Sequence, residues 1–207
     1  MLKPLRYIFV FEKKFSEEER RIPIDFEGLQ FNSLNDLQKS KLVERFTDEE
    51  IKRAVWDCEG NKSSGPDGFN FSFIKSCWGV LEEDVYRMMR EFHSNGTIPR
   101  GGNASFLFLI PKSENPQQLN HYRPISLIRC CYKILAKLLS NQLREVLPEL
   151  IDERQSAFLG GRSILDSIMV ANEIVKEVRR KKAASFIFKA DFEKAYDSVR
   201  WEFCIQS

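Results

Sequence analysis

Two carboxylates near the C-terminal end of the sequence have the type and spacing to bind a metal ion. Asp191 follows a run of β-forming residues, Phe186 to Phe188, and Asp197 stands six residues further on. A strand that ends in an acid before a polar turn presents a carboxylate at the edge of a sheet, and hard cations prefer such oxygen ligands. A simpler interpretation is that Asp191 caps the helix that follows. The local pattern alone favours the cap.

The composition of the whole chain is that of a globular protein. Its 207 residues are 43% hydrophobic and 30% charged, which allows one large domain or two small ones. No apolar run approaches the roughly 20 residues that a membrane span needs. Residues 1–11 slightly resemble a signal peptide but lack a small-residue cleavage site, so we interpret them as an ordinary start. The five cysteines lack metal-ligand spacing, which indicates reduced thiols in an intracellular protein.

The formal net charge of +2 hides a gradient along the chain. Residues 100–147 carry seven basic and two acidic side chains, whereas residues 148–207 carry ten of each. The middle third is therefore the part most suited to a polyanion such as nucleic acid. A solvated basic face with no partner explains the same charges equally well.

Hydrophobic spacing and capping signals predict several helices and one strand. Thr47 and Glu50 form a capping box for a helix at about 48–58. A long helical stretch then carries an apolar stripe from Ile74 to Phe92 and ends at Asn95-Gly96. We expect a strand at 105–110, a helix at about 127–147 that Pro148 closes, and a helix at about 164–181 that Ser163 caps with Asp166 as its partner.

Two polar segments admit a binding role and a structural one. The loop at residues 61–68 contains Lys62 and glycine amides that could face an anion, although a plain linker is favoured by the residues alone. The basic run Arg179 to Lys182 suits the negative end of the preceding helix, and we prefer this to a nucleic-acid patch.

Five short motifs occur in a fixed order and spacing: Lys62–Gly68, Leu109–Lys112, Tyr122–Leu127, Gln155–Arg162 and Lys189–Val199. Each is weak alone. Together they resemble the reverse transcriptase of non-LTR (LINE-type) retrotransposons, most like those of plant genomes. The resemblance covers about residues 42–203.

The resemblance implies an α+β fold, mostly helical with a few short strands. The chain would supply the fingers and the N-terminal part of the palm of a right-hand polymerase, and so be incomplete. We expect residues 1–41 to be a poorly defined segment and residues 42–207 to be a partial reverse transcriptase domain. The missing palm and thumb would come from a full-length element.

The resemblance also assigns roles at the catalytic end. Asp191 would be the catalytic carboxylate, one of three acids that hold two Mg²⁺ ions in the complete family site, and the carbonyl of Phe192 would be a further ligand. Tyr196 would pack under the sugar and select deoxynucleotides.

The remaining implied residues bind the nucleotide and the nucleic acid. The triphosphate of the incoming dNTP would be held by Lys112 and Arg123 and by the amides of Lys194 and Ala195. The RNA template and DNA primer would be contacted mostly through backbone and charge. The residues implied are Gly65, Asp67, Gly68, Lys133, Lys137 and Arg162.

The implied function is RNA-directed DNA polymerisation by two-metal catalysis. The sequence lacks the aromatic-x-Asp-Asp motif that supplies the other two acids, so we expect this fragment alone to be inactive. The alternatives are a non-catalytic RNA-binding remnant and a decayed retroelement fragment. We expect an intracellular protein, nuclear or cytoplasmic and not secreted, without a membrane partner.

Overall fold

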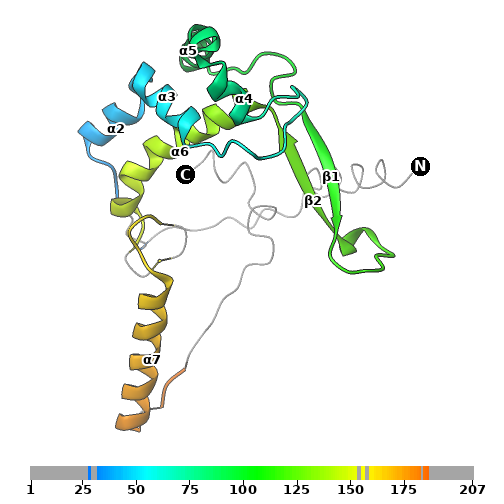
Figure 1. Ribbon diagram of the computed structural model, residues 1–207. Helices are drawn as coiled ribbons and strands as arrows, with labels where there is room; N and C mark the ends of the chain where they lie inside the picture. The colour runs from blue at the N-terminus through cyan, green and yellow to red at the C-terminus, as the bar shows by residue number, and fades with distance from the viewer. Residues whose placement is uncertain (1–27, 29–31, 153–154, 157–158, 183, 187–207) are drawn as a thin grey trace. The chain divides into compact units, whose positions relative to one another are not determined.

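The structure, a computed structural model, describes residues 28, 32–152, 155–156, 159–182 and 184–186. Its elements in chain order are α2 (Asp36–Leu42), α3 (Asp48–Trp56), α4 (Phe71–Ser76), α5 (Trp78–Asn95), β1 (Ser105–Pro111), the 3-10 helix Leu119–His121, β2 (Tyr122–Ile128), α6 (Cys130–Leu150) and α7 (Ile164–Lys181) (Figure 1). The expected α+β class, mostly helical with a few short strands, is confirmed. The chain divides into two compact units, residues 1–153 and 154–207.

Helix α3 begins at the capping box that the sequence predicts. The hydroxyl of Thr47 accepts a hydrogen bond from the Glu50 amide at 3.2 Å, and the Glu50 carboxylate accepts one from the Thr47 amide at 2.8 Å. Two of the amides that a helix start leaves unpaired are thereby satisfied. The predicted apolar face is buried at Ile51, Ala54 and Val55.

Helix α2 is attached to α6 through polar contacts. Lys41 forms an ion pair with Glu145, and the Gln38 amide group donates to the carboxylate of Glu149 at 2.5 Å. The side chain of Asn32 donates to the Glu149 carbonyl at 2.8 Å. No residue of α2 is buried, so polar groups rather than apolar packing hold it in place.

The long helical stretch that the stripe from Ile74 to Phe92 predicts is two helices. The chain leaves helical geometry at Cys77, where φ is −100° and ψ is 17°. Asn70 caps α4 by accepting from the amide of Phe73 at 2.9 Å, whereas α5 starts without a side-chain cap. The predicted end is confirmed, because Gly96 adopts the left-handed conformation at φ 65° that closes a helix.

Strands β1 and β2 form an antiparallel hairpin in which Ser105 lies opposite Ile128 and Pro111 lies opposite Tyr122. The predicted start of the next helix at residue 127 is therefore wrong, because Leu127 and Ile128 pair with β1. The predicted end is also wrong. Helix α6 continues through Pro148 to Leu150, since a proline in the last turn removes only one hydrogen bond near an end that is already incomplete.

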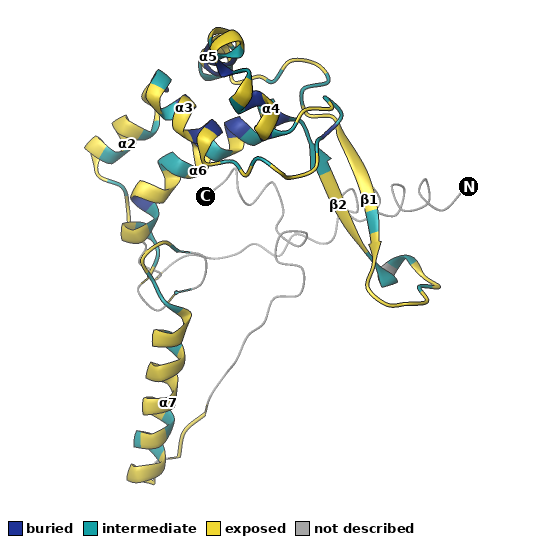
Figure 2. Cartoon of the chain, viewed as in Figure 1, coloured by how far each residue is buried: buried dark blue, intermediate teal, exposed yellow. Residues whose placement is uncertain are grey.

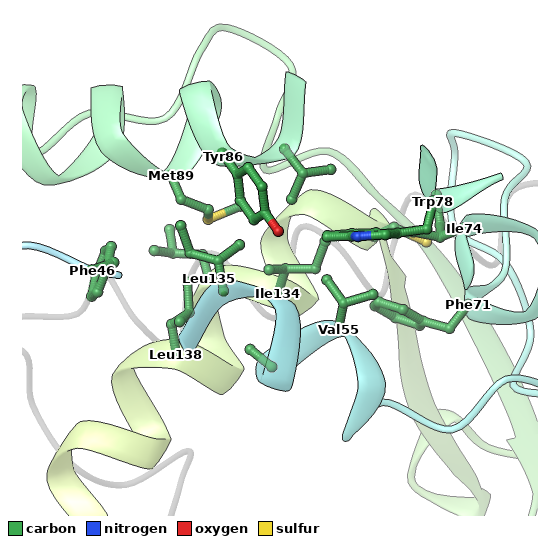
Figure 3. Close-up of a cluster of buried hydrophobic side chains, with 14 residues drawn as sticks. Phe46, Val55, Phe71, Ile74, Trp78, Tyr86, Met89, Ile134, Leu135 and Leu138 are labelled. Carbon is green, nitrogen blue, oxygen red and sulfur yellow. The ribbon is translucent and has the colours of Figure 1, made fainter. Parts of the chain in front are cut away.

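The core lies between α3, α4, α5 and α6 (Figure 3). The indole of Trp78 packs edge-on against Trp56 and Tyr86, with ring centroids 5.1 Å and 5.7 Å apart. The largest fully buried side chains come from three of these helices and are Ile51, Val55, Met89, Ile134 and Leu138. One continuous apolar cluster thus joins helices that are far apart in the sequence.

The second unit contains α7, whose first residue, Ile164, follows the predicted N-cap Ser163. The Ser163 hydroxyl accepts from the amide of Leu165 at 3.2 Å. Asp166 lies in the first turn but forms no capping box with Ser163, so the predicted partnership of these two residues is wrong. None of its residues is buried (Figure 2). Of the helices that the structure describes, none combines the length and the apolar character that a bilayer crossing requires. The domain boundary expected at residues 41 and 42 falls at the end of α2 and stays a prediction.

Candidate nucleotide and nucleic-acid interface

The loop end of the β1–β2 hairpin, where residues 113–120 connect the two strands, carries two cations on one face. The ladder extends one step beyond β1, because the amide of Lys112 donates to the carbonyl of His121 at 2.8 Å. Arg123 lies opposite Ile110, two residues before Lys112. Alternate residues of a strand point to the same face, and directly opposed residues share a face. Lys112 and Arg123 therefore project from the same side of the hairpin.

The strand pairing also sets the distance between the backbone positions of Lys112 and Arg123. They are diagonal neighbours, for which backbone positions are typically about 7–8 Å apart, and both side chains are exposed. Long flexible side chains that start at this spacing can reach the same polyphosphate. Lysine would act as a point charge and arginine as a planar fork.

The remainder of this face is apolar and open. Phe106, Phe108, Ile110 and Ile125 share it by the same register, and each keeps 41–55% of its surface exposed. Exposed aromatic and aliphatic side chains beside cations form a surface on which a base can stack while its phosphates meet positive charge.

The loop at residues 61–69 lies against the junction between β2 and α6. The Asp67 carboxylate accepts a hydrogen bond from the Cys130 amide at 2.6 Å, and the Cys130 thiol donates to the Phe69 carbonyl at 3.2 Å. A Cβ atom at Gly65 would lie 2.5 Å from the carbonyl carbon of Ile128. The second carboxylate oxygen of Asp67 is buried, and no hydrogen-bond partner for it occurs among the described residues. Burial, and next the Asp67 charge, raises the pKa of the Cys130 thiol to about 12.

Comparisons with known proteins point to one family. Residues 110–207 match the family described as "Reverse transcriptase (RNA-dependent DNA polymerase)". Residues 110–207 belong to the reverse transcriptase family. This stretch begins on β1 and includes Lys112 and Arg123, so the cationic face of the hairpin lies within the reverse transcriptase match.

Relatives extend the similarity upstream of residue 110. The chain is 31% identical over 172 residues to a 149 kDa protein of transposon TX1 from Xenopus laevis, covering 83% of this chain and 13% of that protein. It is 28% identical over 153 residues to the Pol polyprotein of the type-1 retrotransposable element R2 from Nasonia vitripennis, covering 74% and 14%. A 115 kDa protein of the element R1DM from Drosophila melanogaster is 27% identical over 156 residues, covering 73% and 15%.

These relatives confirm that the reverse transcriptase domain is of the non-LTR retrotransposon kind. The chain spans about 13–15% of the length of these three proteins. The relatives come from a frog and two insects, and a special likeness to plant elements stays a prediction.

The lysines expected to meet nucleic acid contact oxygen atoms of the chain itself. The Lys133 ammonium donates to the Ser63 carbonyl at 3.2 Å, and the Lys137 ammonium lies 3.7 Å from the Asp57 carboxylate. A phosphate group would have to share or displace these contacts. Their role in nucleic-acid binding stays a prediction.

Gly65, Gly68 and Asp67 have a structural role that the motif does not reveal. Gly65 and Asp67 fasten the loop to α6, and Gly68, at φ 74°, completes the turn by donating its amide to the Gly65 carbonyl at 3.0 Å. A signal for this role is the residue at the start of α6. Arg129 occupies the N-cap position, where a serine, threonine, aspartate or asparagine would ordinarily accept the hydrogen bond.

The remaining expected site residues are in or near the second unit. Arg162 stabilises its own turn, since the guanidinium donates to the Gln155 carbonyl at 2.6 Å. The five residues expected at the catalytic end, Asp191, Phe192, Lys194, Ala195 and Tyr196, lie outside the described residues. In the described part of the chain, no group of three or more histidine, cysteine, aspartate or glutamate side chains is placed to hold a metal ion.

Proposed function

We propose that this chain supplies the nucleotide-holding fingers and the first palm motif of an RNA-directed DNA polymerase. The observation that carries the proposal is the shared face of Lys112 and Arg123 at the loop end of the hairpin, inside the segment that matches reverse transcriptases. The ligand would be a dNTP, whose triphosphate offers several anionic oxygens to one ammonium and one guanidinium group.

The hairpin would act mainly by positioning and by charge. Phosphoryl transfer asks the protein to align the reacting groups and to stabilise negative charge that moves between oxygens. Lys112 and Arg123 would neutralise the triphosphate on one side. Phe106 and Phe108, on the same face, would offer apolar contact to bases nearby.

The catalytic end would hold divalent ions. Reverse transcriptases act with divalent metals, and we propose two Mg²⁺ ions with Asp191 and the carbonyl of Phe192 among the ligands. Carboxylate and carbonyl oxygens are the donors that such hard cations take. When bound, the ions would activate the primer hydroxyl and stabilise the transferring phosphoryl group. The amides of Lys194 and Ala195 would support the triphosphate, and Tyr196 would exclude a ribose 2′-hydroxyl.

We propose an RNA template and a DNA primer as the macromolecular partners. An exposed cationic hairpin supports this, because polyanion binding requires charge that remains accessible to phosphates. We also propose an intracellular location, nuclear or cytoplasmic. The free thiols of Cys58, Cys77, Cys130 and Cys131 support a reducing compartment.

The test is to measure the binding of dTTP to the purified chain by isothermal titration calorimetry. Lys112→Ala and Arg123→Ala should each weaken binding by roughly tenfold or more, because each removes a charge-assisted hydrogen bond worth about 1.5–3 kcal/mol. Lys39→Ala on α2 and Arg87→Ala on α5 are matched controls, since both remove an exposed cation of the same type elsewhere. Equal affinities in all four variants would contradict the proposal.

A further inference from the structure

Helix α6 begins without a cap from its own sequence. Its N-cap residue is Arg129, whose side chain cannot accept a hydrogen bond, and the helix start has no side-chain cap of its own. The missing acceptor comes from a residue 63 positions away, because Asp67 accepts from the amide of Cys130 at 2.6 Å. A carboxylate there also suits the positive end of the helix dipole.

Further contacts tie the same loop to the same junction. Gly65 lies so close to the backbone of Ile128 and Arg129 that a Cβ atom would stand 2.5 Å and 2.8 Å from their carbonyl carbon and amide nitrogen. The Cys130 thiol donates to the Phe69 carbonyl at 3.2 Å. We call the contacts of Gly65 and Asp67 with Ile128 and Cys130 the Asp67 clip.

The clip holds the point from which the hairpin extends. Ile128 is the last residue of β2, α6 starts two residues later, and Arg123 lies five residues earlier on the same strand. Figure 1 shows the hairpin reaching away from the helices of its unit. The extensive contacts of β1 and β2 among the described elements are with each other, whereas α6 packs on α3. The direction of the hairpin therefore depends on the junction with α6.

We propose that Asp67 is a positioning residue, which orients the Lys112 and Arg123 face by capping α6 from a distance. The inference rests on the proposed function, because the orientation of the Lys112 and Arg123 face matters only if that face binds a nucleotide. Asp67 itself does not touch the nucleotide. It fixes the first turn of α6, and through Ile128 it fixes the base of the strand that carries Arg123.

Two substitutions separate capping from charge. Asp67→Asn removes the charge but keeps a short side chain whose oxygen can accept from the Cys130 amide, and asparagine is a strong N-cap residue. Asp67→Glu keeps the charge but adds a methylene in a loop that already touches backbone at Gly65. A positioning role predicts that Asp67→Asn retains anion binding by the hairpin, whereas Asp67→Glu loses it. A role through charge alone predicts instead that Asp67→Asn binds the anion more tightly and that Asp67→Glu binds it as the unmodified chain does.

The probe is inorganic tripolyphosphate, titrated into the folded chain at a temperature well below each variant's melting point. We expect Asp67→Asn to bind within about twofold of the unmodified chain, and Asp67→Glu and Asp67→Ala to bind at least about fivefold more weakly. Removal of a negative charge by itself would tighten the binding of an anion. Asp84→Ala, which removes an exposed carboxylate on α5, is the control and should not weaken binding. Unchanged or tighter binding by Asp67→Ala would overturn the proposal.

Amide hydrogen exchange distinguishes failure of the positioning role of Asp67 from failure of the proposed function of the hairpin. Asp67→Glu should speed exchange at residues 122–131 more than at the core residues of α3, whether or not tripolyphosphate binds. If the unmodified chain does not bind tripolyphosphate, the nucleotide role of the hairpin is wrong. The exchange pattern still shows whether the Asp67 clip holds the junction between β2 and α6. Exchange at residues 122–131 that is unchanged in Asp67→Glu would overturn the positioning role.

Discussion

Replacement of Gly65 by alanine should destabilise the protein, because the structure leaves no space for a Cβ atom. The new carbon would lie 2.5 Å from the carbonyl carbon of Ile128 and 2.8 Å from the amide nitrogen of Arg129, and closer still to the Ile128 carbonyl oxygen. All three are backbone atoms at the end of β2, so no side chain can rotate to relieve the contact. Either the loop or the strand must move.

The expected loss is about 1–2 kcal/mol in the free energy of unfolding. Overpacking of a close contact costs roughly 1–3 kcal/mol. Alanine returns about 0.4–1 kcal/mol of this, because it restricts the unfolded chain more than glycine does. For a chain of this size each kcal/mol corresponds to about 2–4 °C in melting temperature, so the melting temperature should fall by about 2–8 °C.

The assay is thermal unfolding followed by circular dichroism, with Gly79→Ala as the matched control. Gly79 lies in α5 with no atom within 4 Å of an added Cβ, and alanine is the better helix former by about 1 kcal/mol. The same substitution should therefore raise the melting temperature at Gly79 and lower it at Gly65. A melting temperature that is unchanged or raised in Gly65→Ala would refute the close approach of the loop to β2.

Three further predictions concern the core, a helix start and a buried thiol. Thr47→Ala should cost about 1 kcal/mol, because it removes the capping hydrogen bond to Glu50, and urea unfolding would measure the loss. Ile134→Ala should cost about 2–5 kcal/mol and Ile134→Val about 0.5–1.5 kcal/mol, since this side chain is 2% exposed; similar values for both would contradict the packing. The pKa of Cys130 is raised from 9.0 to about 12, so the folded state favours the protonated thiol, and its contribution to stability should be lost as pH rises from about 9 toward 12. The stability difference between the unmodified chain and Cys130→Ala should shrink over that range, and a constant difference would argue against burial of the thiol.

Elements with local signals were predictable from the sequence. The Thr47 and Glu50 capping box, the left-handed Gly96 and the Ser163 cap each act within a few residues of the helix end that they define. Such contacts depend on neighbouring residues alone, so a single sequence is enough to find them.

The errors have more than one cause, and tertiary contacts that override the local pattern explain only some of them. Leu127 and Ile128 fit a helical stripe, but pairing with β1 holds them in a strand. Pro148 is a strong stop signal, yet α6 continues past it to Leu150. The break at Cys77 has no glycine or proline to mark it, and no local residue explains it. The role of Asp67 depends on a partner 63 positions away, which spacing along a single chain does not reveal.

The basic excess of residues 100–147 illustrates why a charge count overstates the surface available to a polyanion. The C-terminal end of α3 carries the negative end of a helix dipole together with Asp57. Lys137 pairs with that carboxylate, and Lys133 donates to the Ser63 carbonyl.

These lysines compensate charge and carbonyl groups inside the fold, so they contribute less to the field that an approaching phosphate meets. Lys112 and Arg123 belong to the same basic stretch, but the hairpin carries them away from the helices on one exposed face. We therefore expect substitution of Lys112 or Arg123 to reduce the salt dependence of polyanion binding more than substitution of Lys133 or Lys137 does. Substitution at Lys133 or Lys137 should act mainly on stability.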